Sequence, residues 1–365
     1  MKNRVDRPFL IIVLILVCAG FFIFTSASLG LLVRDGASFT GVALNQFLFG
    51  IVLGGFALFV MSRVSYKTLR KYAFHIFVLS LVVTILVFIP HIGFWHGGAK
   101  RWIAIGSYTF QPTEFLKIGF IIYFAAWLAS VKDKVATYKF GLLPLIIFLA
   151  IVGAVVLSQP DTDTFIIMAV SAIGMFIVAG GRYRDIGLIG GILLIAVSLF
   201  VATHLYTIDR VKTFLDPARD PLNSGYQIQQ SLIAVGSGQI FGRGFGQSIQ
   251  KFNYLPEPIG DSIFAVAAEE FGFVGSSLLI ILFVLFAFRA LKIASRAPDM
   301  FSGLLIVGIV ILIISQSFMN IGAMLGVLPL SGLPLIFISH GGTALLFALL
   351  EVGIILNISR YQKSL

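Results

Sequence analysis

Long apolar runs separated by short polar segments dominate the chain. Ten of these runs approach or reach the length of about 20 residues that a membrane-spanning helix needs. They cover residues 8–33, 46–62, 72–90, 114–130, 141–158, 165–180, 186–205, 271–291, 301–318 and 339–359. Backbone groups in lipid must find their partners within a helix. The pattern therefore predicts an all-α polytopic membrane protein with ten transmembrane helices in a single domain over residues 1–365.

The composition excludes the other protein classes. Hydrophobic residues make up 58% of the chain and charged residues 12%, against roughly half and a quarter in soluble domains. Cys18 is the single cysteine, which rules out an internal disulfide and a Cys-based zinc site. The net charge of +10 is explained first by membrane topology, so it does not indicate a nucleic-acid partner.

The distribution of basic residues orients the predicted helices. Most of the 26 Lys and Arg residues lie in the set of loops that includes both ends of the chain. Basic loops stay in the cytoplasm, so we expect both termini to be cytoplasmic. Two longer loops then lie outside, at about 91–111 and 206–270, and the second is a large extracytoplasmic loop between helices 7 and 8. No nucleotide-binding domain is recognisable, which argues against ATP-driven transport by this chain.

The outer loops combine acidic and basic side chains. A carboxylate can act as a general base, and cations can hold an anionic leaving group. For any single residue, a solvated loop with ion pairs is the simpler interpretation. The candidate cations are Lys100, Arg101, Arg210, Lys212, Arg243 and Lys251.

A proline-rich turn precedes the eighth predicted helix. Pro256 and Pro258 flank Glu257 and favour an extended backbone there. Asp261 follows the turn, either as the N-cap of the helix or as a carboxylate held towards an outer cavity. A continuous helix from Asp261 to the inner-side Arg289 would rise about 42 Å. Because the hydrocarbon core is about 30 Å thick, Asp261 must lie at or above the outer surface.

Two charged residues fall at the start of the fourth predicted helix. Glu114 and Lys117 are three residues apart, so they share a helix face and can neutralise each other. Charges within a span usually face the bundle interior or a water-filled cavity. A structural ion pair and the polar wall of a substrate cavity both remain open.

A glycine-rich stretch occupies residues 236–246 of the large loop. Backbone amides in such a stretch can cradle phosphate. No strand–helix context for a nucleotide site surrounds it, so a flexible loop is the favoured interpretation.

Several short motifs occur in a fixed order along the chain. They are Lys100-Arg101-Trp102, Gln111-Pro112-Thr113-Glu114, Gln159-Pro160-Asp161, Leu255-Pro256-Glu257-Pro258, Glu269-Glu270 and Asn357-Ile358-Ser359-Arg360. In these motifs the whole chain resembles the SEDS family (shape, elongation, division and sporulation), the family of FtsW and RodA.

The resemblance implies a ten-span peptidoglycan glycosyltransferase of the bacterial cytoplasmic membrane. Its substrate would be lipid II, an undecaprenyl-pyrophosphate disaccharide-peptide, and its partners a class B penicillin-binding protein and other division or elongation membrane proteins. The family's catalytic aspartate aligns with Asp261, and its membrane-cavity acid and lysine align with Glu114 and Lys117. No cofactor is firmly implied. A divalent cation, Mg²⁺ or Mn²⁺, held by Asp261 and Glu257 is left open.

Departures from the family pattern surround Asp261. Ile259, Gly260 and Ser262 stand where the family commonly has His, Thr and Phe. This change leaves room for altered substrate preference or reduced activity. Two other functions therefore stay open, a lipid II flippase and a non-catalytic scaffold for cell-wall enzymes.

Overall fold

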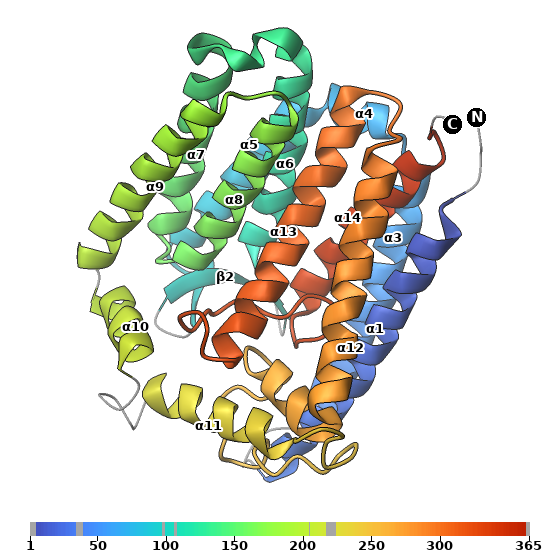
Figure 1. The fold of residues 1–365 in the computed structure, drawn as a ribbon, viewed down its shortest axis with the longest axis vertical. Helices are drawn as coiled ribbons and strands as arrows, with labels where there is room; N and C mark the ends of the chain where they lie inside the picture. The colour runs from blue at the N-terminus through green and yellow to red at the C-terminus, as the bar shows by residue number, and fades with distance from the viewer. Residues whose placement is uncertain are drawn as a thin grey trace.

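The computed structural model describes residues 5–33, 39–96, 99–105, 108–203, 205–216 and 224–362. Residues 217–223 of the predicted large outer loop lie outside this part. The helices are α1 (Arg7–Ser28), α2 (Phe39–Asn45), α3 (Leu53–Arg63), α4 (Tyr66–Lys71), α5 (Ala73–Ile85), α6 (Pro112–Val131), α7 (Leu143–Leu157), α8 (Thr162–Val178), α9 (Tyr183–Thr203), α10 (Leu205–Leu215), α11 (Ser224–Ser237), α12 (Ile263–Ala294), α13 (Met300–Met324) and α14 (Gly342–Ser359). Figure 1 shows them as one bundle, with α10 and α11 at the end opposite the chain termini.

Each of the ten predicted apolar runs contains a helix. Within the described ranges, seven helical segments are long and apolar enough to cross a membrane. They are Arg7–Leu32, Gly41–Arg63, Pro112–Ala136, Tyr138–Leu157, Ile263–Ala294, Met300–Met324 and Gly342–Ser359. Two shorter apolar helices, Ala73–Phe88 and Thr162–Val178, pack among them. The chain is therefore a largely helical, multi-pass membrane protein.

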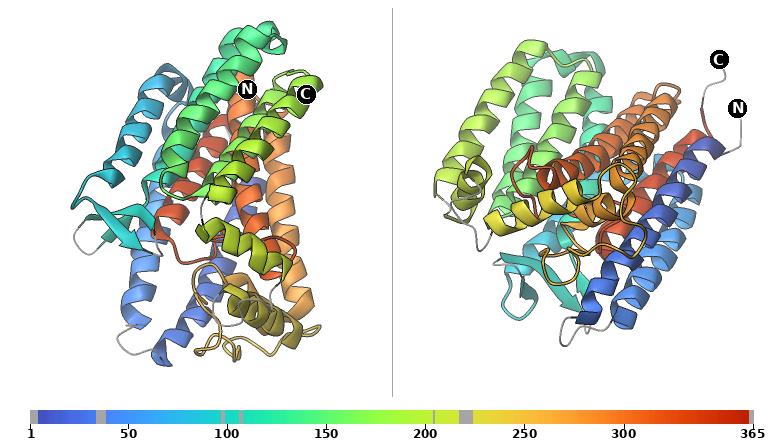
Figure 2. Two further views of the ribbon diagram at one scale, coloured as in Figure 1. Left: turned by 90° about the vertical axis from the view of Figure 1, so that its left-hand side faces the viewer. Right: turned by 60° about the horizontal axis from the view of Figure 1, so that its bottom comes forward.

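Helix α13 forms the centre of the bundle, in contact with α6, α8 and α12. It begins at a reciprocal capping box, in which the Asp299 carboxylate accepts the Ser302 N–H at 3.0 Å. The second views show α3 and α14 side by side, next to α1 (Figure 2). The interior of this bundle is the apolar core, and it fixes the frame from which the polar residues project.

The two ends of the chain meet at one end of the bundle. The Asp6 carboxylate caps α1 by accepting the Phe9 N–H at 3.0 Å. It also pairs with Arg289 of α12 at 2.9 Å, and the Asp6 N–H donates to the Ser359 hydroxyl at 3.1 Å. The start of α1 and the ends of α12 and α14 are therefore joined.

The loop that follows α5 contains a small antiparallel sheet, in the order β1 (Gly93–His96), β2 (Ala99–Ile105) and β3 (Tyr108–Phe110). Ile103 of β2 pairs with both Gly93 and Phe110. The expectation of an all-α chain is wrong for this loop, because aromatic and β-branched residues are frequent there and favour a pleated surface.

A break at Gly272 divides α12 into a short helix, residues 263–271, and a long one. Gly272 has φ 66° and ψ −164°, which are not helical values. The segment 239–244 enters the break and replaces the lost helical hydrogen bonds with its own backbone groups. The bonds run from Phe273 N to Gln239 O (2.8 Å), Val274 N to Ile240 O (3.0 Å), Arg243 N to Glu269 O (3.0 Å) and Gly244 N to Glu270 O (3.0 Å).

This insertion explains the glycine-rich stretch. A Cβ on Gly238 would lie 2.0 Å from the Ala268 carbonyl oxygen, and one on Gly242 would lie 2.1 Å from the Glu270 carbonyl oxygen. No real side chain fits at such distances, so glycine is required for the close approach of the two backbones. The segment is ordered by its bonds to α12, and the expectation of a flexible loop is wrong here.

Candidate active site

The turn before α12 carries Asp261. Its backbone conformation at Glu257 differs from the expected one. Glu257 has φ 45°, although its flanking prolines favour an extended backbone. The reason is that the Glu257 carbonyl accepts the N–H groups of both Gly260 and Ser262, each at 3.1 Å, and this closes the turn. The N-cap of α12 is Ser262, which makes no side-chain capping bond. The proposed capping role of Asp261 is therefore wrong.

The backbone of this turn is fixed by α13 and by the segment before α14. The Asp261 carbonyl accepts a hydrogen bond of 2.7 Å from the Asn320 side chain of α13. The Gly260 carbonyl accepts the Ser339 hydroxyl at 2.8 Å, and the Ile259 carbonyl accepts the His340 N–H at 2.7 Å. The segment before α14 thus holds Asp261 in place.

Charged side chains from three other elements converge on Asp261 around Gly332. A Cβ built on Gly332 would lie 3.5 Å from Nη2 of Arg210, 4.0 Å from Nη1 of Arg101 and 4.0 Å from Oδ2 of Asp261. Asp163, in the first turn of α8, pairs with Arg210 at 3.1 Å and accepts the Gly332 N–H at 3.1 Å. The absence of a side chain at Gly332 leaves room for this cluster.

The Arg101 side chain is anchored from the other direction. It extends from β2 and donates to the carbonyl oxygens of Gln159 and Pro160, the first at 3.1 Å. The small sheet therefore serves to present a guanidinium group to the Asp261 cluster.

The electrostatic surroundings of Asp261 favour its neutral form. Burial raises the pKa of the carboxyl to about 7, and repulsion from Glu257 and Asp163 acts in the same direction. Arg210 and Arg101 oppose the change. The residue itself is half-buried. A carboxyl whose pKa lies near the operating pH is well suited to act as a general base.

Glu114 and Lys117 form a buried pair on α6. Their charged atoms are 2.7 Å apart, and the Lys117 ammonium also donates to Oε1 of Gln316 in α13 at 2.8 Å. Gln316 in turn donates to the Pro334 carbonyl at 3.0 Å. Glu351 of α14 is also buried and interacts electrostatically with both. These contacts favour the structural ion pair over the wall of an open cavity.

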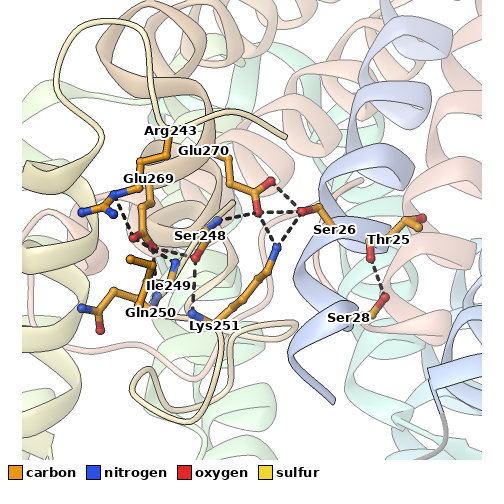
Figure 3. A network of polar contacts seen from close by, with 10 residues as sticks. All are labelled: Thr25, Ser26, Ser28, Arg243, Ser248, Ile249, Gln250, Lys251, Glu269 and Glu270. Carbon is orange, nitrogen blue, oxygen red and sulfur yellow. Dashed lines mark hydrogen bonds and ion pairs between the residues drawn. The ribbon is translucent and has the colours of Figure 1, made fainter. Parts of the chain in front are cut away.

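The remaining predicted cations are not brought to Asp261. Lys251 is fully buried and pairs with Glu270 at 2.7 Å, and Arg243 lies 3.4 Å from Glu269 (Figure 3). Lys100 precedes Arg101 at an irregular point of the β1–β2 pairing and is not among the charges that act on Asp261. Lys212 is exposed on α10, two residues beyond Arg210, and does not share its face.

The carboxylates near the turn do not make a complete metal site. Among the described residues, no group of three or more His, Cys, Asp or Glu could hold a metal ion. Mg²⁺ is commonly bound through one or two carboxylates together with substrate phosphates. Asp261 and Glu257 fit that pattern, and a divalent cation there stays a prediction.

An apolar groove of about 480 Å³ lies between α7, α8 and α9. Gly153, Phe165 and Ile192 are among its lining residues. Ser158 also lines it and directly precedes Gln159, whose carbonyl binds Arg101. The wall residue Ser158 is therefore the chain neighbour of the residue that anchors Arg101.

Three polar residues of this site, Asp163, Asn320 and Ser339, were not predicted to be site residues. Asp163 stands two residues after the Gln159-Pro160-Asp161 motif, and this spacing was the available signal. Asn320 and Ser339 act through the backbone of a turn far away in the chain. Such contacts leave no local pattern.

A protein-family model described as a cell cycle protein, FtsW/RodA/SpoVE, matches residues 6–364. Stage V sporulation protein E of Bacillus subtilis (strain 168) is 37% identical over 365 residues, covering 99% of this chain and 99% of that protein. The probable peptidoglycan glycosyltransferase FtsW of Geobacter sp. (strain M18) is 35% identical over 361 residues, covering 98% and 97%.

Solved structures share the fold. One is a chain from a structure described as the structural coordination of polymerization and crosslinking by a peptidoglycan synthase complex. It matches with a TM-score of 0.80 and 26% identity over 98% of both chains. The rod shape determining protein RodA of Thermus thermophilus matches with a TM-score of 0.72 and 23% identity, covering 99% of this chain and 98% of that one.

Proposed function

Because the chain belongs to the FtsW, RodA and SpoVE family of cell cycle proteins, we propose that it is a peptidoglycan glycosyltransferase. In this proposal it polymerises lipid II into glycan strands at the outer face of the bacterial cytoplasmic membrane. The observation that carries the proposal is Asp261, a half-buried acid with a raised pKa, beside Arg101 and Arg210. A base next to two fixed cations suits a reaction that releases a pyrophosphate.

The proposed topology has ten spans with both termini in the cytoplasm. The occurrence of a helix in each of the ten apolar runs supports it. So does the junction of Asp6, Arg289 and Ser359 at one end of the bundle. In this arrangement Asp261 stands at the extracytoplasmic end of α12, where lipid-linked sugars are polymerised.

The reaction that these residues support is an inverting glycosyl transfer. Asp261 accepts the proton of the 4-hydroxyl of the acceptor sugar, and the oxygen attacks the anomeric carbon of the donor. The bond from that carbon to the pyrophosphate oxygen breaks, and undecaprenyl pyrophosphate leaves with the electron pair. Arg101 and Arg210 stabilise the charge that develops on the leaving group. Asp261 then returns its proton to water.

The groove between α7, α8 and α9 suits the polyprenyl chain of the donor. Its walls are apolar, and Ser158 in the wall directly precedes Gln159, whose carbonyl binds Arg101. A chain in the groove would leave the pyrophosphate near the two arginines. A divalent cation held by Glu257 and Asp261 would add positive charge to the same pyrophosphate.

The proposed partner is a class B penicillin-binding protein, which would crosslink the new strands, alongside other division or elongation membrane proteins. The match to a chain from a peptidoglycan synthase complex supports an assembly of this kind.

The test is polymerisation of lipid II by the purified chain, with and without a co-expressed class B partner. Asp261→Asn should abolish glycan synthesis while the protein still folds. Undiminished synthesis by this variant would contradict the assigned role. In liposomes, movement of labelled lipid II without polymer would indicate a flippase. Growth supported by the inactive variant would indicate a scaffold.

A further inference from the structure

The short helix 263–271 has Asp261 just before its start and two buried glutamates near its end. Glu269 accepts hydrogen bonds from the Ser248 hydroxyl at 2.6 Å and from the backbone N–H groups of residues 249 and 250 at 3.1 and 3.2 Å. Arg243 adds an ion pair at 3.4 Å. These donors engage both oxygens of the Glu269 carboxylate (Figure 3).

Glu270 is held from a different direction, by α1. The Ser26 hydroxyl of α1 donates to the Glu270 carboxylate at 2.6 Å. The fully buried Lys251 ammonium bridges the two, at 2.7 Å from Glu270 and 3.1 Å from Ser26. Glu269 and Glu270 thus balance Arg243 and Lys251 in charge. Buried polar networks whose groups are all satisfied are rigid.

The backbone at this end of the helix is fixed as well. The inserted segment 239–244 binds the carbonyls of Glu269 and Glu270 and the N–H groups beyond Gly272. The short helix cannot pivot about the break without losing these bonds. Residues 262–270 are all buried, so the helix is also enclosed by packing along its length.

The geometry points to Glu269 and Glu270 as positioning residues, which orient the short helix and thereby hold Asp261 against Glu257, Arg101 and Arg210. Neither glutamate touches the Asp261 cluster. Glu269 follows Asp261 by eight residues, which is about 12 Å along a helix at 1.5 Å per residue. Their carboxylates are engaged by protein donors, so they are not candidates for a second base. This inference rests on the proposed function of Asp261.

The experiment compares Glu269→Gln with the wild-type full-length protein in the lipid II polymerisation assay. Activity is expressed per folded molecule, with kcat and KM measured separately over a range of pH. We expect kcat to fall up to about 10²-fold, as for a misplacement of roughly 1 Å, with KM little changed. The midpoint of the pH–rate profile should shift, because Asp261 would change its distance from the neighbouring charges.

A milder variant covers the possibility that Glu269→Gln does not fold. Ser248→Ala removes one neutral donor and leaves no buried charge unpaired, and it should lower kcat about fivefold. The matched control is Asp6→Asn, which breaks the ion pair with Arg289 at the opposite end of α12. This control should lose thermal stability and keep the wild-type pH profile.

The outcomes separate the inference from the proposal on which it rests. A lower melting temperature in Ser248→Ala and Glu269→Gln, with kcat and the pH profile unchanged, would make the network purely structural and overturn the inference. Full activity of Asp261→Asn would overturn the proposed function instead. An inactive Asp261→Asn together with a shifted profile in Glu269→Gln supports both.

Discussion

Glycan synthesis by this protein should depend on pH in the range where an ordinary aspartate does not titrate. The pKa of Asp261 is about 7, raised from 3.8 chiefly by burial. If the ionised carboxylate is the general base, its fraction is about one tenth at pH 6 and about nine tenths at pH 8. The rate should therefore rise nearly tenfold across this interval. An aspartate with its usual pKa would give a flat profile.

Two substitutions should move the midpoint of that profile in opposite directions. Repulsion from Glu257 raises the pKa of Asp261, so Glu257→Gln should shift the midpoint to lower pH. Attraction by Arg210 lowers this pKa, so Arg210→Gln should shift it to higher pH. Both variants should also lose rate at the plateau if they contact the substrate, but the plateau does not affect the midpoint.

The assay is initial-rate polymerisation of labelled lipid II in detergent between pH 5.5 and 8.5, with the ionic strength held constant. Thermal unfolding at each pH confirms that the protein remains folded. A profile that is flat between pH 6 and 8, or a shift of both variants in the same direction, would refute the assignment of Asp261 as the titrating base.

Three further predictions concern stability. Lys117→Met leaves Glu114 buried without its partner and should destabilise the fold by about 3–5 kcal/mol. The melting temperature should fall, and the additional change Glu114→Leu should largely restore it. Gly272→Ala should prevent folding, because φ is 66° and a Cβ would lie 2.3 Å from the inserted backbone, whereas Gly236→Ala meets nothing within 4 Å and should be neutral or stabilising by about 0.5–1 kcal/mol. With Asp261 at a pKa of about 7 against 3.8, the folded state binds more protons than the unfolded state between these values. This carboxyl therefore makes the protein less stable as pH rises through that window, and Asp261→Asn should weaken the pH dependence of thermal melts.

The helices were predictable because the signal for them is local. An apolar run long enough to span a membrane has no stable alternative to a helix in lipid, and each predicted run contains one. The break at Gly272 was not predictable in the same way. It depends on the close approach of residues 239–244 to α12. From the sequence alone, the glycines of that segment are equally consistent with a flexible loop.

The site was predictable only for residues that carry a motif. The proline-rich turn and the family resemblance pointed to Asp261. Residue type alone could not show which of the predicted cations lie beside it. Arg210 reaches Asp163, 47 residues away in the chain, and joins the cluster. Lys251 instead pairs with Glu270 and is buried. Both are basic residues of the segment between α9 and α12, and only the tertiary fold separates their roles.

The contrast between Asp261 and Glu270 explains why the site can titrate near neutral pH. Glu270 has a lysine at 2.7 Å, and this close pair offsets the cost of burying its charge. Asp261 instead faces two carboxylates, Glu257 and Asp163, against two guanidinium groups. Repulsion and attraction then largely cancel, so the cost of desolvation is left uncompensated and raises the pKa. A closer arginine would fix the carboxylate as a permanent anion and weaken it as a base. The reactive state of Asp261 therefore depends on the position of the whole turn, which the contacts of Asn320 and Ser339 maintain.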